Sequence, residues 1–230
     1  MSQDQPGLFG ETAAPSFEER EKPAAKPPVF LPGIKPNEGY TGIADIAALE
    51  QEAQGCSRCH LRAGCRQVVF ADGIPSADIM LVGEGPGQTE DEMGKPFVGK
   101  AGQLLDKILL SVQFERSALY ITNVVKCRPP DNRLPNQLEI AACRGFLEAQ
   151  IRLLQPSLII CLGALATQTI IDPKAKITQM RGRWFVRDGI MIIPTYHPAA
   201  LLRNDSLKRP VWEDFKKIRS EASDRGWKTC

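Results

Sequence analysis

The sequence predicts an α/β fold in three layers, in which helices cover both faces of a central four-stranded parallel sheet. Four short apolar runs alternate with segments whose apolar residues recur at helical spacing. Continuous apolar runs are typical of strands buried on both faces, and strands that alternate with helices are typical of parallel sheets. At 230 residues, 43% of them hydrophobic, the chain is long enough for one such domain with a tail.

The expected strands are short and mostly apolar. They are residues 79–82, 119–125, 158–162 and 190–193. The first stops at Gly83 and the third is followed by Gly163, where a buried strand would open into a loop.

The expected helices follow from periodicity and capping residues. They are residues 43–54, 101–112, 136–154, a helix after Gly163 that ends at Ile171, and a last helix that begins at Pro210. Asn136 and Glu139 have the spacing of a capping box, and proline is favoured in the first turn of a helix. The expected inner face of the 136–154 helix comprises Leu138, Ala142, Phe146, Ala149 and Leu153.

The chain divides by composition at about residue 38. Residues 1–38 are rich in proline and poor in large apolar side chains, so we expect a disordered tail. Residues 39–230 form the expected domain. No run of 18 apolar residues and no signal peptide is present, which predicts a cytoplasmic protein without a membrane anchor.

A net charge of +2 does not by itself indicate nucleic-acid binding, but basic residues cluster locally. Each cluster is a candidate phosphate contact, with a solvated face as the more common alternative. The clusters are Lys126, Arg128 and Arg133; Arg181 and Arg183; and Arg203, Lys208 and Arg209.

Chemically active side chains follow three of the expected strands. Glu84 lies in the glycine-rich loop 83–87, Asn123 lies near the end of the second strand, and His197 follows the fourth. The carboxyl ends of parallel strands share one edge of a sheet, where ligands bind, so we expect these residues to meet. The structural alternatives are a simple turn for the loop that contains Glu84, an amide that only holds a turn for Asn123, and a structural histidine for His197.

Seven cysteines in a reducing compartment indicate metal ligands or buried thiols rather than disulfides. Cys56 and Cys59 form a Cys-x-x-Cys pair, and Cys127 and Cys143 are distant partners. This pattern fits a [4Fe-4S] cluster at least as well as zinc, because four thiolates suffice for the cluster. Zinc is the alternative, with His60 or Cys65 as substitute ligands. Cys161 lies inside an apolar strand and is expected to be a core thiol.

Residues 41–220 resemble the family 4 uracil-DNA glycosylases, the iron–sulfur type. Besides the Cys56–Cys59 pair, three separated motifs in the right order support the resemblance. They are GEGPGQTEDEMGKPFVGKAG from Gly83, ITNVVKCRPPDNRLPNQLEIAAC from Ile121, and HPAALLR from His197. The resemblance implies a four-stranded parallel sheet between helices and a structural [4Fe-4S] cluster held by Cys56, Cys59, Cys127 and Cys143. No fifth ligand is expected, so Cys65 departs from the pattern.

The resemblance also implies the residues of the active site. Glu84 would orient the attacking water, and His197 would stabilise the leaving base. Gly85 would contribute backbone near the base, Phe97 would stack on the flipped uracil, and Asn123 would recognise its edge.

Further residues would act around the base and on the DNA. Glu90 would lie beside the pyrimidine and exclude the methyl group of thymine. Arg128 would lie in a phosphate-binding loop, and Leu201, Leu202 and Arg203 would lie in a loop that wedges into the minor groove.

The implied function is a DNA repair glycosylase that removes uracil from single- and double-stranded DNA and leaves an abasic site. We expect a monomer that binds uracil-containing DNA, with a tail that is a candidate docking segment for a replication or repair protein. One alternative is a relative that traps uracil-DNA covalently, but its inserted histidine-containing loop is missing from residues 97–102. The other is a non-catalytic, zinc-stapled nucleotide-binding module.

Overall fold

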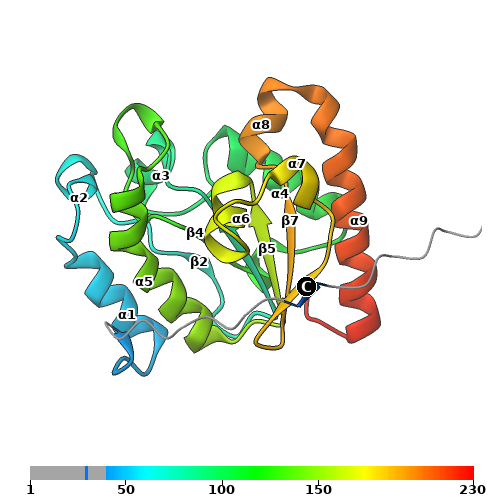
Figure 1. Ribbon diagram of the computed structural model, residues 1–230, viewed down its shortest axis with the longest axis horizontal. Helices are drawn as coiled ribbons and strands as arrows, with labels where there is room; N and C mark the ends of the chain where they lie inside the picture. Colours follow the sequence, from blue (N-terminus) through cyan, green and yellow to red (C-terminus); the bar gives the residue numbers. More distant parts are fainter. Residues whose placement is uncertain (1–28, 31–39) are drawn as a thin grey trace, which may run out of the picture.

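A sheet of parallel strands forms the centre of the computed structural model, which describes residues 29–30 and 40–230 (Figure 1). Its parallel strands are β3 (Ile79–Gly83), β4 (Tyr120–Asn123), β5 (Leu158–Leu162) and β7 (Ile190–Thr195). They lie in the order β7-β5-β3-β4, and every pair of neighbours is parallel. The prediction of a central four-stranded parallel sheet is confirmed.

Three short strands that were not predicted extend this sheet at its edges. β6 (Phe185–Arg187) pairs antiparallel with β7, and β1 (Val29–Phe30) pairs parallel with β6. At the other edge β2 (Asp72–Gly73) pairs antiparallel with β4. Strands of two or three residues are too short to show a hydrophobic period, so the sequence has no signal for them. Apart from Val29–Phe30, the predicted tail lies outside the described residues.

The long helices agree with the predictions to within a few residues. The helices are α1 (Ile46–Gln54), α2 (Leu61–Gly64), α3 (Gln88–Met93), α4 (Lys100–Ser111), α5 (Gln137–Leu154), α6 (Ala164–Ile170), α7 (Ile177–Met180), α8 (Pro198–Arg203) and α9 (Lys208–Arg225). Short 3-10 turns are η2 (Arg116–Ala118), η3 (Pro130–Asn132) and η4 (Asp205–Leu207). Helix α1 begins later than predicted because the Asp45 side chain accepts from the Ala48 N–H and caps it there. The capping box of Asn136 and Glu139 is present at the start of α5.

Each face of the sheet has its own hydrophobic core, because successive strand side chains point to opposite faces. Met80, Val82 and Ile159 face a core that includes residues of α1, α5 and α6. Ile79 and Leu81 face a second core that includes residues of α4, α8 and α9. Figure 1 shows α1 and α5 on one side of the sheet and α9 on the other. The three-layer arrangement follows.

The predicted inner face of α5 is wrong in its first turn. Leu138 is 82% exposed, whereas its neighbour Glu139 is fully buried. Glu139 accepts two hydrogen bonds from Arg133 and lies 2.6 Å from Nε2 of His60. These polar contacts orient the start of α5 so that the Glu139 carboxylate faces inward and Leu138 faces solvent.

The strand register brings the expected site residues together at the carboxyl edge. Gly83 at the end of β3 is paired with Asn123 at the end of β4. On the other side of β3, Leu162 of β5 is paired with Thr195 of β7, two residues before His197. Among the described residues, no helix combines the length and the apolar character needed to cross a membrane.

Candidate active site

A glycine, an amide and an aromatic ring meet at the ends of β3 and β4. A Cβ atom on Gly83 would lie 2.4 Å from both Asn123 Oδ1 and Phe97 Cζ. Real Cβ atoms do not approach other atoms so closely, so only glycine leaves room for this contact. The Phe97 ring is buried, and its backbone has a φ of +54°, the left-handed region that a bulky residue rarely adopts.

The side chain of Asn123 ends in a buried oxygen without a partner. Asn123 is 1% exposed, and its Oδ1 accepts no hydrogen bond from the described residues. An unsatisfied buried acceptor costs free energy, and nearly all such groups in folded proteins have partners. This oxygen therefore suits a bound molecule that donates an N–H group.

His197 is the N-cap residue of α8, and this position sets its protonation. Its Nδ1 accepts a hydrogen bond from the Ala199 N–H at 3.1 Å. A neutral imidazole that accepts at Nδ1 carries its proton on Nε2. Burial lowers the pKa of His197 to about 4, and the charge of Arg203 adds to this effect. The residue is therefore a neutral hydrogen-bond donor near pH 7, and its ring centroid lies 5.5 Å from that of Phe97.

Glu84 continues the chain directly after β3. Its carbonyl oxygen accepts from the Val125 N–H at 3.2 Å, so the loop stays paired with the segment after β4. Burial raises the pKa of the Glu84 carboxyl, and the positive charge of Arg203 opposes the rise. A Cβ on Gly85 would lie 2.7 Å from Cγ2 of Val125, so this glycine also permits a close backbone approach.

Glu90, in α3, holds the turn that follows Phe97. Its Oε1 accepts from the backbone N–H groups of Val98 at 2.9 Å and Gly99 at 2.7 Å. A Cβ on Gly87 would lie 2.8 Å from its other oxygen. This contact was not predicted, although Glu90, Val98 and Gly99 lie within one motif.

The segment after His197 is a helix and not the predicted loop. Leu201 is 1% exposed and packs in the core beneath α8, so it cannot insert into DNA as predicted. Leu202 is 50% exposed, and Arg203 is exposed at the end of the helix. Successive helix residues point in different directions, and α8 turns Leu201 toward the core and Leu202 toward solvent.

Two of the candidate phosphate contacts, Lys126 and Arg181, are instead engaged within the protein. Lys126 is 2% exposed, and its ammonium donates to Thr122 Oγ1, the Asn123 carbonyl and Gln150 Oε1 at 2.6–2.7 Å. Arg181 is paired with the buried Asp214, with 2.8 Å between Nη2 and Oδ1. Arg128 is partly exposed and bonds only to the Asn132 side chain among the hydrogen bonds of the described residues, so it can still reach a phosphate.

The four predicted metal-binding cysteines line one small pocket. Cys56 and Cys59 come from the segment after α1, Cys127 from the loop after β4, and Cys143 from α5. The Lys126 N–H donates to Cys143 Sγ at 3.3 Å. Burial raises the pKa of the Cys127 thiol, and the neighbouring Cys65 adds to the rise. In the described part of the chain, no three His, Cys, Asp or Glu side chains form a group that could hold a single metal ion. Cys161 is fully buried in β5, as predicted.

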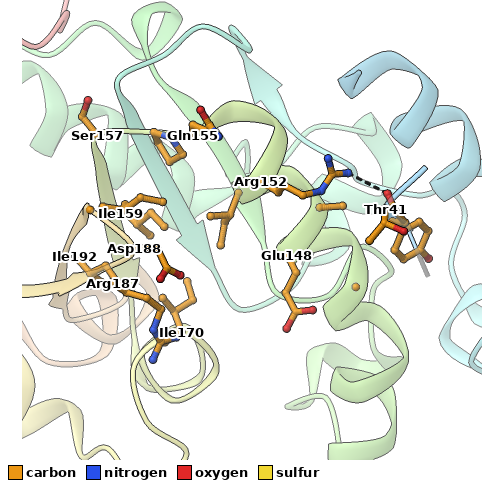
Figure 2. A pocket seen from close by; sticks show the side chains of 17 residues that line it. Thr41, Glu148, Arg152, Gln155, Ser157, Ile159, Ile170, Arg187, Asp188 and Ile192 are labelled. Carbon is orange, nitrogen blue, oxygen red and sulfur yellow. Dashed lines mark hydrogen bonds between the residues drawn. The ribbon is translucent and has the colours of Figure 1, made fainter. Parts of the chain in front are cut away.

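A cavity of about 530 Å³ lies at the opposite, amino-terminal edge of the sheet. Figure 2 shows Glu148 and Arg152 of α5 on one side and Arg187 and Asp188 on the other. Arg152 donates to the carbonyls of Tyr40 and Ile43, and Arg187 donates to that of Ile171, so both guanidinium groups are engaged with backbone. None of the predicted site residues lines this cavity.

Comparison with known proteins agrees with this geometry. The model of the uracil DNA glycosylase superfamily matches residues 70–216. A type-4 uracil-DNA glycosylase of Sulfurisphaera tokodaii is 43% identical over 186 residues, which are 77% of this chain and 84% of the relative. One of Thermotoga maritima is 42% identical over 193 residues, which are 81% of this chain and all of the relative. A type-5 uracil-DNA glycosylase of Pyrobaculum aerophilum is 28% identical over 172 residues, 67% of this chain and 75% of the relative. This chain therefore belongs to the uracil-DNA glycosylase superfamily and, within it, to the type-4 enzymes.

Proposed function

We propose that this glycosylase hydrolyses the N-glycosidic bond of uracil in single- and double-stranded DNA and leaves an abasic site. The observation that supports it most directly is the buried Oδ1 of Asn123, which has no hydrogen-bond partner in the described part of the chain and lies beside the Phe97 ring. Uracil has an N–H donor next to a carbonyl acceptor on its pairing edge, and an amide offers the complementary acceptor and donor. The ring supplies a surface on which the base can stack.

The base reaches this site outside the helical stack. A duplex hides the glycosidic bond, so the enzyme extrudes the nucleotide and accepts a few kcal/mol of unstacking. In our proposal Leu202 and Arg203 at the end of α8 fill the vacated position in the minor groove. Arg128 binds a phosphate of the same strand.

The reaction separates charge between the sugar and the base. As the C1′–N1 bond breaks, the uracil becomes negative and the sugar becomes positive. His197 donates from Nε2 to uracil O2 as negative charge develops there. The Glu84 carboxylate orients the water and stabilises the positive sugar. Gly85 brings backbone close to the base, and Glu90 lies at its far edge, where a methyl group would collide.

We further propose that Cys56, Cys59, Cys127 and Cys143 hold a [4Fe-4S] cluster. One zinc ion would require sulfur atoms within about 4 Å of each other, because each zinc–sulfur bond is about 2.3 Å long. The thiols of a cluster bind different irons and are therefore spaced more widely. Four cysteines from three segments of the chain converge on one pocket, and four thiolates are what a [4Fe-4S] cluster requires.

The cluster would serve the fold and would not enter the reaction. Its ligands come from the segment after α1, the loop after β4 and α5, so it would tie these three segments together. The loop after β4 follows Asn123 directly and includes both Cys127 and Arg128, so the cluster would help to hold this loop in position. We expect the enzyme to act as a cytoplasmic monomer.

The decisive assay uses a uracil-containing oligonucleotide, single-stranded and paired, followed by alkaline cleavage at abasic sites. Cleavage of both forms, with none for the matched thymine oligonucleotide, is the expected result. If neither the single-stranded nor the paired oligonucleotide is cleaved, the proposed reaction is refuted. A brown protein with absorbance near 400 nm would support the cluster, and a colourless, zinc-loaded protein would refute it.

A further inference from the structure

The backbone of Phe97 needs an external restraint. Its φ of +54° is unfavourable for an aromatic residue, and such conformations persist only where the surroundings hold them. The direction of the ring depends on this backbone. Any residue that holds the backbone therefore controls where the ring stands in the base site.

Arg116 supplies the restraint on the carbonyl side. It lies in η2, just before β4, and its Nη2 donates to the Pro96 carbonyl at 2.7 Å. Its Nη1 donates to the Phe97 carbonyl at 3.0 Å. A planar guanidinium with donors in a fixed fork is suited to bind two neighbouring acceptors at once.

Two carboxylates fix the guanidinium itself. Arg116 Nε donates to Asp72 Oδ2 and Nη1 donates to Asp106 Oδ1, each at 3.0 Å. Asp72 lies in β2 and Asp106 in α4, so the arginine is held by two elements besides its own. Its side chain is 25% exposed, which makes these contacts only partly open to water.

The same peptide group is held from its other end. The Val98 N–H donates to Glu90 Oε1, while the Phe97 carbonyl accepts from Arg116. A Cβ on Gly102 would lie 1.9 Å from the Phe97 oxygen, so the absence of a side chain there makes room for this carbonyl. The peptide between Phe97 and Val98 is thus fixed by opposite charges at its two polar atoms.

We propose that Arg116 is a positioning residue for base recognition, which holds Phe97 in its left-handed conformation so that the ring can stack on the base. It acts through Phe97 and does not touch uracil. The inference rests on the proposed function, because the role of the ring is part of that function.

Binding of free uracil tests this role, because the free base occupies only the base site. The experiment compares Arg116→Met with the wild type in an NMR titration with uracil. Typical base–aromatic stacking energies predict binding weaker by about 5- to 150-fold. Affinity for abasic-site DNA, which rests on phosphate contacts, should change little. Arg225→Met is the matched control, since Arg225 is the last residue of α9, where it pairs with Glu221 and lies over the Trp227 ring.

A double-mutant cycle separates positioning from general loss of stability. Phe97→Ala should weaken uracil binding in the wild type but much less in Arg116→Met, because the ring is already misplaced there. Unchanged uracil binding in Arg116→Met would overturn the proposal. Full additivity of the two losses would overturn it as well.

Two milder variants keep the test open if Arg116→Met does not fold. Arg116→Lys keeps the charge but cannot bind both carbonyls and both carboxylates, so it should bind uracil with intermediate affinity. Asp72→Asn should weaken binding in the same direction by loosening the guanidinium. Wild-type uracil affinity in both variants refutes the role of Arg116. A wild-type protein that binds uracil but leaves uracil-DNA intact refutes the proposed reaction alone.

Discussion

The imidazole of His197 lies against the ring of Phe97, with the ring centroids 5.5 Å apart and the planes tilted by 30°. Phe97 follows α3, whereas His197 follows the last parallel strand, β7. A Cβ on Gly163 would lie 2.9 Å from Cβ of His197, so the histidine also packs tightly against the end of β5. The contact between the two rings puts His197, the proposed leaving-group donor, beside Phe97, the proposed stacking surface.

His197→Ala should slow the chemical step more than Glu84→Gln does. Removing one donor to a developing negative charge typically costs about 10²–10³ in rate. Glu84→Gln keeps the shape of the side chain but removes its charge, so it should be partly active. Single-turnover rates on a uracil oligonucleotide measure both losses. Both variants should still bind uracil-DNA, and near wild-type rates in both would refute the mechanism.

The acid dependence of the rate should come from Glu84 and not from His197. Burial holds the pKa of His197 at about 4, so the imidazole is neutral above pH 5 and does not titrate near 6.5. Burial raises the pKa of Glu84, so the active carboxylate is lost as the pH falls, at a higher pH than in a free glutamate. Single-turnover rates between pH 4.5 and 8 should decline in acid for the wild type and stay flat for Glu84→Gln. An acid decline near pH 6.5 that survives in Glu84→Gln would point to His197 instead.

Gly83→Ala should weaken base binding without unfolding the protein. The added methyl group would meet Asn123 Oδ1 and the Phe97 ring at 2.4 Å, so one of them must move. The expected result is uracil binding at least about tenfold weaker, as a loss of 1.4 kcal/mol gives. Gly42→Ala is the control, because its Cβ would have no neighbour within 4 Å. Equal uracil affinity in the two variants would show that the contact between Asn123 and Phe97 is dispensable.

Replacing Cys56, Cys59, Cys127 or Cys143 by Ala should remove iron and soluble yield together, because metal binding at such sites is coupled to folding. Cys65→Ala should keep its iron, although Cys65 lies beside Cys127. Iron content per protein and absorbance near 400 nm give the measurement. Loss of iron in Cys65→Ala, with iron retained in Cys59→Ala, would show that the ligand set is wrong.

Arg203→Ala should reduce cleavage of duplex DNA more than cleavage of single strands, because only the duplex needs a residue to fill the vacated stack. Arg225→Ala is the matched control, since Arg225 is the last residue of α9, lies outside the basic clusters and pairs with Glu221. The ratio of duplex to single-strand rates is the quantity to compare. Equal losses on both substrates would argue that Arg203 acts on the active-site charges and not on the duplex.

Much of the site was predictable because it depends on strand order. Asn123 and Glu84 both follow apolar strands, and parallel pairing of β3 with β4 puts their strand ends in register. His197 could also have been identified as an N-cap residue, because Pro198 occupies the first turn of α8. That local signal would have predicted the Nδ1 contact with Ala199 and a helix in place of a loop.

Other features had no local signal. The sequence does not show that Lys126 is buried and Arg128 is accessible, since both follow the same apolar strand. Burial of Lys126 depends on Gln150, which lies 24 residues away on α5. The exposed first turn of α5 likewise reflects the bonds that Glu139 makes with Arg133 and His60.

The sequence by itself determined the order of strands and helices, the edge where the site lies and the cysteines that share a pocket. The first two follow from hydrophobic period and turn residues, which are local properties of the chain, and the cysteine set follows from the resemblance of its motifs to the family 4 enzymes. Only the tertiary structure decided that Leu202 and not Leu201 faces solvent, and that Arg116 binds the Pro96 carbonyl from 20 residues away. Such contacts form because packing brings distant segments together, and no local pattern records which side chains will meet.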